Sequence, residues 1–241
     1  MELLKRLINE VPNIPVEEVI IGVFSTLIKA GKYEGLASTL HYKRPHHKVR
    51  NSGSLEKLSL RELAEFSLSD NLIEASVGMA AINAVAAFTK NNYRKVNAKD
   101  IILEKGKGKN VGVIGHFPFL VELKNEFNKL QIFEKQPQEN DLSENEIPRY
   151  LPNADVVALT ATSITNHTFD DIMRFISSKS YTVMLGPSTP LSPILFDFGI
   201  DVISGTIVKD YSIFRKNVIQ ATPTRFMEGK EFVTIFKKDF K

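Results

Sequence analysis

Five short apolar segments follow one another through the second half of the chain, and polar or turn-forming residues come after each of them. The segments lie at 110–114, 130–134, 155–160, 181–185 and 201–206. Runs such as Val156–Leu159 are continuously apolar, which is typical of parallel strands covered on both faces. Helices are expected between them at 117–128, 168–178, 193–198 and 209–216, with a last strand at 231–236. This alternation predicts an α/β fold with a Rossmann-like, doubly wound parallel sheet.

The first half of the chain has a different pattern. An amphipathic helix is expected over 1–10, a capped helix from Ser59 to about Ser67, and a long alanine-rich helix over 72–89. Strands are expected at 16–24, 26–30 and 36–40, with a turn at 33–35. The connections between these strands are too short for crossovers, so the sheet should be an antiparallel meander. We therefore expect an α+β domain at residues 1–95 and a Rossmann-like domain at 96–241.

Composition excludes several classes of function. The chain has no cysteine, so a metal would have to be held by histidine, carboxylate or carbonyl groups. A net charge of +3 over 241 residues gives no reason to expect nucleic acid as a partner. The longest apolar run, at 72–88, is interrupted by polar residues, and the N-terminus lacks the pattern of a signal peptide. We expect a cytoplasmic protein without a membrane span, and a homo-oligomer is compatible with the sequence.

Polar residues and glycines follow the predicted parallel strands, where the carboxyl ends of all strands meet at one edge. That edge is where open α/β sheets bind ligands, so these residues are the candidate binding site. The first strand is followed by a glycine, a histidine that could serve as a base or a metal ligand, and a phenylalanine, and the second strand ends in a glutamate. The candidates are Gly115, His116, Phe117, Glu134, Asn166, Gly186, Ser188 and Thr189. Each also has a simpler interpretation as a loop or turn residue.

Glu134 lies 19 residues after Gly115, where nucleotide-binding Rossmann domains place an acid on a ribose hydroxyl. The glycine fingerprint of a dinucleotide site is absent, and Pro118 removes an N–H group that would cradle phosphate. NAD and FAD are therefore not expected, and a methyl-donor nucleotide would suit this turn better. The sequence does not identify a cofactor.

Two polar residues of the helix at 72–89 are further candidates. Glu74 could act as a catalytic acid or base, although its place in the first helical turn already favours a negative charge. Asn83 stands among alanines and must find hydrogen-bond partners if it is buried, as a structural cross-link or as part of a site. The basic segment 41–50, with three histidines including His46 and His47, is either an anion or metal site or a solvated loop.

Six motifs in order along nearly the whole chain resemble a family of unknown function that carries the label "putative heavy-metal chelation". They are Ser-Gly-Ser-Leu at 52–55, Glu-Ala-Ser-Val-Gly-Met-Ala-Ala-Ile-Asn-Ala at 74–84, Gly-His-Phe-Pro-Phe at 115–119, Leu-Pro-Asn-Ala-Asp at 151–155, Ile-Thr-Asn-His-Thr at 164–168 and Gly-Pro-Ser-Thr-Pro-Leu-Ser-Pro at 186–193. The resemblance implies an enolase N-terminal-like domain followed by a Rossmann-like domain similar to those of methyltransferases. It also implies an interdomain site that draws on Glu74, Asn83, His116, Glu134, Asn166, Ser188 and Thr189.

The function that the resemblance implies is the processing of a pterin-, flavin- or siderophore-like compound that chelates metal. Condensation or hydrolysis is the expected reaction, because neither a hydride-cofactor motif nor a nucleophile motif is present. Glu74 or His116 would move protons in such a reaction. The alternatives are non-catalytic binding of a metal ion or metal chelate, binding of a methyl-donor nucleotide, and a regulatory or structural role without a site.

Overall fold

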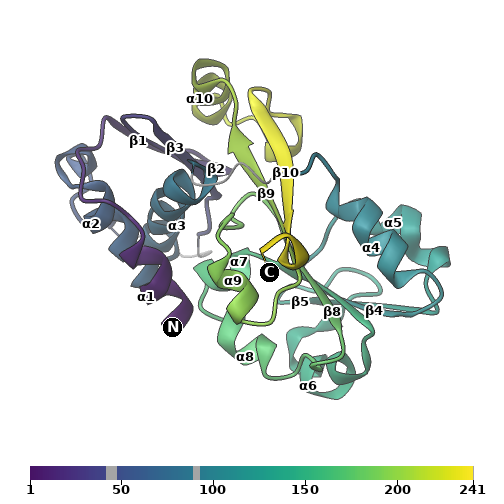
Figure 1. The fold of residues 1–241 in the computed structure, drawn as a ribbon. Helices are drawn as coiled ribbons and strands as arrows, with labels where there is room; N and C mark the ends of the chain where they lie inside the picture. Colours follow the sequence, from purple (N-terminus) through teal and green to yellow (C-terminus); the bar gives the residue numbers. More distant parts are fainter. Residues whose placement is uncertain (42–47, 89–92, 241) are drawn as a thin grey trace.

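The computed structural model describes residues 1–41, 48–88 and 93–240, and it contains two sheets (Figure 1). The expected fold class is confirmed: an antiparallel three-stranded meander with helices precedes a seven-stranded, mostly parallel sheet. His46 and His47 of the basic segment lie outside the described residues. In the part of the chain that is described, no helix is both long and apolar enough to cross a membrane.

The first half consists of a short sheet and the helices that cover it. The sheet has the order β1-β2-β3, and both pairs of neighbouring strands are antiparallel. Its elements are α1 (Glu2–Asn9), β1 (Glu18–Ile21), β2 (Ser25–Ala30), β3 (Tyr33–Ser38), α2 (Leu60–Glu65) and α3 (Leu72–Phe88). The capping box predicted at Ser59 and Glu62 is present at the start of α2. The turn predicted at 33–35 is wrong, because the chain reverses at Gly31 and Lys32 and residues 33–35 already pair with β2.

The second half forms the large sheet, with the strand order β10-β9-β8-β7-β4-β5-β6. All its pairs are parallel except that of β10 with β9. The strands are β4 (Asn110–Ile114), β5 (Lys129–Glu134), β6 (Leu142–Ser143), β7 (Val156–Thr160), β8 (Tyr181–Leu185), β9 (Val202–Val208) and β10 (Lys230–Phe236). The helices are α4 (Ala98–Gly106), α5 (Leu120–Leu123), α6 (Ile147–Tyr150), α7 (Thr162–Thr165), α8 (Phe169–Met173), α9 (Ile194–Asp197) and α10 (Tyr211–Ile219).

The helices of the second half differ most from the prediction. A nine-residue helix, α4, lies just after the expected domain boundary, where no helix was predicted. The helix expected at 117–128 is reduced to α5 and a 3-10 turn at Lys124–Glu126. The residues before α5 form a turn in which the rings of Phe117 and Phe119 stack 5.7 Å apart.

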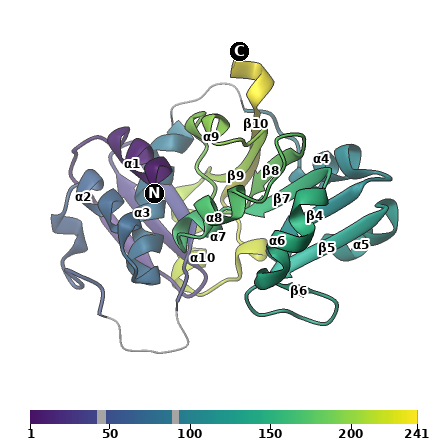
Figure 2. The same ribbon diagram turned by 90° about the horizontal axis from the view of Figure 1, so that it is seen from below.

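Alternation along the strands divides the core between the two faces of the large sheet. Val111 and Val113 of β4 pack with α4 and α5, whereas Ile114 packs with the cluster that contains α6 to α9. The cluster that contains Ile114 also includes buried side chains of α1, α2 and α3, so the two halves of the chain share one core. Figure 2 shows the first half beside the large sheet, with α7 and α8 near α1 and α3.

The strand order reverses between β4 and β7, which are neighbours at the centre of the sheet. From β4 the chain crosses to β5 on one side, and from β7 it crosses to β8 on the other. The loops after these two strands therefore diverge and leave a crevice at the carboxyl edge. Such a switch point is the usual ligand site of an open α/β sheet.

Candidate functional site

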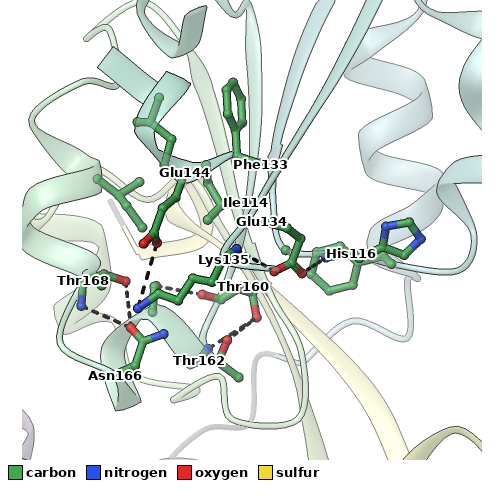
Figure 3. Close-up of a pocket in the computed structure, with 15 residues that line it drawn as sticks. Ile114, His116, Phe133, Glu134, Lys135, Glu144, Thr160, Thr162, Asn166 and Thr168 are labelled. Atoms are coloured by element: carbon green, nitrogen blue, oxygen red, sulfur yellow. Dashed lines mark hydrogen bonds and ion pairs between the residues drawn. The ribbon is translucent and has the colours of Figure 1, made fainter. Parts of the chain in front are cut away.

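A cavity of about 290 Å³ opens at this switch point, beyond the ends of β4, β5 and β7 (Figure 3). Ile114, Phe133, Ile147 and Ile172 form its apolar floor and sides. The polar side chains that line it are His116, Glu134, Lys135, Glu144, Thr160, Thr162, Ser163, Asn166 and Thr168. The structure thus brings together five residues that the sequence predicted: Gly115, His116, Phe117, Glu134 and Asn166.

The β4 turn holds the carboxylate of Glu134 in place. Gly115 adopts a φ of 100°, which L-residues rarely adopt, and this turns the backbone sharply at the strand end. The N–H group of His116 then donates to Glu134 Oε1 at 2.8 Å, and the N–H group of Lys135 donates to Oε2 at 3.1 Å. Each carboxylate oxygen can accept another hydrogen bond, so Glu134 remains able to bind a ligand donor.

The imidazole of His116 pairs with a second carboxylate. Nδ1 lies 3.3 Å from Oδ2 of Asp141, whose side chain is 2% exposed and which also accepts the N–H group of Gln138 at 3.0 Å. With Nδ1 donating to Asp141, Nε2 is the nitrogen available as a proton acceptor. In Figure 3 the ring lies on the opposite side of Glu134 from the Lys135 ammonium. His116 therefore stands at the rim of the cavity, and 27% of its side chain is exposed.

The opposite wall comes from the end of β7 and the segment that follows it. The hydroxyls of Thr160 and Thr162 lie 2.9 Å apart, and Oδ1 of Asn166 accepts the N–H and hydroxyl groups of Thr168 at 3.2 and 2.7 Å. Because the amide oxygen is engaged, the Nδ2 group of Asn166 is the donor that it can offer to a ligand. Lys135 extends toward this wall in Figure 3, and its Nζ lies 3.9 Å from Oε2 of Glu144. The wall therefore offers mainly hydrogen-bond donors and hydroxyl groups.

The structure does not bring Glu74 to this cavity. Glu74 is 3% exposed and accepts three hydrogen bonds: from the backbone N–H of Arg50 at 2.7 Å, from Arg50 Nε at 2.9 Å and from the hydroxyl of Ser69 at 2.7 Å. Burial raises the pKa of this carboxyl group, but the hydrogen bonds from Ser69 and Arg50 outweigh burial and lower the pKa below its ordinary value. Through these contacts, Glu74 connects Arg50, at the end of the basic segment, and Ser69 to the start of α3.

Asn83 forms a hydrogen bond between α3 and β3. Its Nδ2 donates to the carbonyl of Leu36 in β3 at 2.8 Å, in a buried position. Its Oδ1 has no partner among the described residues, and the residue does not line the cavity. Asn83 therefore ties α3 to the meander, and the walls of the cavity all come from the second half of the chain.

The loop after β8 is also placed elsewhere. Gly186 lines a second cavity, which shares Phe117 with the first. The hydroxyl of Ser188 accepts the N–H of Ser38 at 2.9 Å, which joins this loop to β3. Thr189 is buried, and its hydroxyl has no partner within the described part of the chain. The loop thus contacts the first half of the chain rather than the first cavity.

Three charged residues near the site, Lys135, Asp141 and Glu144, were not predicted. Lys135 directly follows the predicted glutamate, so its place at the strand end was visible in the sequence. Asp141 and Glu144 flank β6, a two-residue strand without a recognisable pattern. Across residues 1–41, 48–88 and 93–240, no three side chains of the types His, Asp and Glu gather closely enough to hold a metal ion.

The fold defines a Rossmann-like α/β protein with a cavity at the switch point of its large sheet. Two family models match the chain, at residues 4–86 and 97–237, and both carry the description "Putative heavy-metal chelation". The second model alone matches more than half of the chain, and the chain belongs to this family.

Solved structures of the family share the fold over the whole length. A protein of unknown function from Desulfitobacterium hafniense is 30% identical, with a TM-score of 0.86 over 98% of both chains. Another from Pyrococcus horikoshii is 22% identical, with a TM-score of 0.82 over 97% of this chain and 98% of that one. An uncharacterized protein of Methanocaldococcus jannaschii is 29% identical over 183 residues, which are 73% of this chain and 70% of that protein.

Proposed function

We propose that this protein binds a small, heteroatom-rich organic molecule of the metal-chelating kind in the cavity beyond β4, β5 and β7. The observation that carries the proposal is the convergence of Glu134, Lys135 and Asn166 on one cavity at the switch point. A chelating compound presents several oxygen and nitrogen lone pairs. Lys135, the amide of Asn166 and the threonine hydroxyls can donate to such lone pairs, and Glu134 can accept from a ring N–H or hydroxyl group.

An organic ligand fits the cavity better than a bare ion. The cavity volume, about 290 Å³, is at the lower end of the range for small-molecule sites and suits a pterin or catechol ring system. A bare cation would require several converging ligands, and the described residues offer no such group of three. The family description, heavy-metal chelation, agrees with a ligand that itself carries the chelating atoms.

His116 is the residue we propose for proton transfer if condensation or hydrolysis follows binding. Its Nδ1 faces Asp141, which orients the ring and leaves Nε2 to accept a proton. Glu74 does not share this role in the proposal, because its oxygens are occupied by Arg50 and Ser69. His116→Ala should then abolish turnover of a bound compound, which mass spectrometry can follow. The affinity of the variant for that compound should change little.

The first test is calorimetric titration of the full chain with 6-carboxypterin, riboflavin, 2,3-dihydroxybenzoate and zinc ion alone. We expect one organic compound to bind, and Glu134→Gln or Lys135→Met to weaken that binding about tenfold, because each removes a charged hydrogen-bond partner. Glu126→Gln, at an exposed 3-10 turn, is the matched control. Binding of zinc alone, or organic binding that is unchanged in both cavity variants, would contradict the proposal.

A methyl-donor nucleotide is the second candidate ligand. It is favoured by one observation: Glu134 ends β5, next to the central strand β4, where Rossmann domains hold a ribose hydroxyl. S-adenosylhomocysteine in the same titration separates the two candidates. If this nucleoside binds and the chelating compounds do not, the second candidate replaces the first.

A further inference from the structure

A second cavity, of about 300 Å³, adjoins the first at the β4 turn, because Phe117 lines both. Its walls are largely apolar and aromatic, with Phe119, Leu185 and Phe232 among them. Phe232 is 54% exposed although it stands on a strand of the sheet. A flat apolar ligand entering here would cover this ring and the stacked pair of Phe117 and Phe119.

One polar residue that lines this cavity has a buried hydroxyl without a partner among the described residues. Thr206 of β9 is 6% exposed, and its hydroxyl makes no hydrogen bond within the described residues. Thr206 pairs directly with Phe232 of β10, so both side chains stand on the same face of the sheet and both line the cavity. A buried hydroxyl without a hydrogen-bond partner is unfavourable, and a polar ligand atom that reached it would remove this cost.

A cation lies at the same cavity. Arg225, in the 3-10 turn η6 (Thr224–Phe226), is exposed and lines the cavity, and it makes no ion pair in the part of the chain that is described. Lys230 positions this turn by donating to the carbonyl oxygens of Thr224 and Met227. The first turn of α4, at Ala98, also lines the cavity and adds a favourable field for negative charge.

We propose that this second cavity binds a planar aromatic carboxylate of one or two rings. The ring system packs against Phe117, Phe119 and Phe232. The carboxylate pairs with the planar guanidinium of Arg225, which matches its two oxygens, and lies near the hydroxyl of Thr206. This site is distinct from the cavity of the proposed function, and the shared Phe117 places the two ligands side by side.

The test uses the full chain, labelled with ¹⁵N and titrated with 2-naphthoate. We expect the amide signals of Phe117, Thr206 and Phe232 to shift.

Arg225→Gln should weaken binding of 2-naphthoate about tenfold, because it removes the charge that pairs with the carboxylate. Phe232→Ala should weaken binding by a similar factor through lost ring contact. Both replaced side chains are exposed, so both variants should fold. Arg174→Gln, at an exposed arginine of another loop, is the control and should bind as the wild type does.

Two further probes examine the chemistry of the ligand. Neutral 2-naphthamide should bind about tenfold more weakly than 2-naphthoate if the charge matters, and cyclohexanecarboxylate should be weaker if the aromatic rings matter. Equal affinity of wild type and Arg225→Gln would overturn the proposal, as would signal shifts confined to Glu134 and Asn166. Glu134→Gln should leave naphthoate affinity within about twofold, so failure at this cavity is distinguishable from failure at the first.

Discussion

Replacement of Gly78 by alanine is expected to lower the free energy of unfolding by about 4 kcal/mol or more, the largest effect we predict for a single methyl group. Gly78 lies in α3, where that helix crosses the segment joining α2 to it. A Cβ atom at this position would stand 1.9 Å from the backbone nitrogen of Ser67 and 2.5 Å from its Cα. Backbone atoms cannot rotate away as a side chain can, so the helix itself would have to move.

Moving α3 would disturb most of the first half of the chain. The helix lies directly on β3, where a Cβ at Gly35 would meet the carbonyl oxygen of Ala80 at 2.2 Å. Gly78 thus allows α3 to pack closely on the backbone at Ser67, and Gly35 allows β3 to pack closely on the backbone of α3. Neither contact has room for an added methyl group. Buried side chains of α3 belong to the core shared with the large sheet, so the loss of stability should affect the whole chain.

Urea unfolding of Gly78→Ala, followed by circular dichroism, measures this effect. Gly108→Ala is the matched control, because a Cβ there meets nothing within 4 Å and only the φ of 68° opposes the change. That control should lose about 1–2 kcal/mol through backbone strain. Equal stability of the two variants would show that α3 has room to shift, against the contacts described here.

The sequence predicted the large sheet well because its central strands are buried on both faces. Such strands must be apolar along their length, and this pattern can be recognised in the sequence without knowing which strands pair. The prediction failed where a short element is stabilised by its surroundings. The apolar residues of α4, Ala98, Ile101 and Ile102, do have helical spacing, but lysines around them conceal it. β6 has two residues and exists only through its pairing with β5.

The candidate site was predictable to the extent that topology determines it. Because parallel strands end at one edge, Gly115, Glu134 and Asn166 could be expected together, and they line one cavity. The partner of a buried polar side chain cannot be inferred in this way. Asn83 and Glu74 are both buried, which fits a role in a site as well as a structural role. Their contacts with Leu36 and Arg50 favour the structural role.

Replacement of Glu74 by glutamine is expected to destabilise the chain by about 2–3 kcal/mol at pH 7, the second largest effect. The glutamine would keep the shape of the side chain but lose its charge. Its amide group would also present a donor to Arg50 and Ser69, which themselves donate to the carboxylate in the wild type. Glu56→Gln, at an exposed glutamate, is the control and should change stability little.

The effect of Glu74→Gln should depend on pH with a defined sign. The pKa of Glu74 is lower in the folded chain than its ordinary value of 4.5. The stabilisation by its charge is therefore fully present above about pH 4.5 and is lost as the pH falls through the folded-state pKa. Urea unfolding at several pH values from 7 down to 4 should show the difference between wild type and variant narrowing at the acid end. A difference that widens in acid would contradict this assignment.

The same variant tests whether Glu74 belongs to the binding site. If its role is to hold Arg50 and Ser69 at the start of α3, then an organic ligand of the switch-point cavity should bind Glu74→Gln within about twofold of the wild type, under conditions where both are folded. If Glu74 reaches the ligand, as the sequence allowed, affinity or turnover should fall as strongly as in Glu134→Gln. Stability and ligand affinity measured on this one variant therefore show whether the Glu74 carboxylate has a structural role or takes part in binding and turnover.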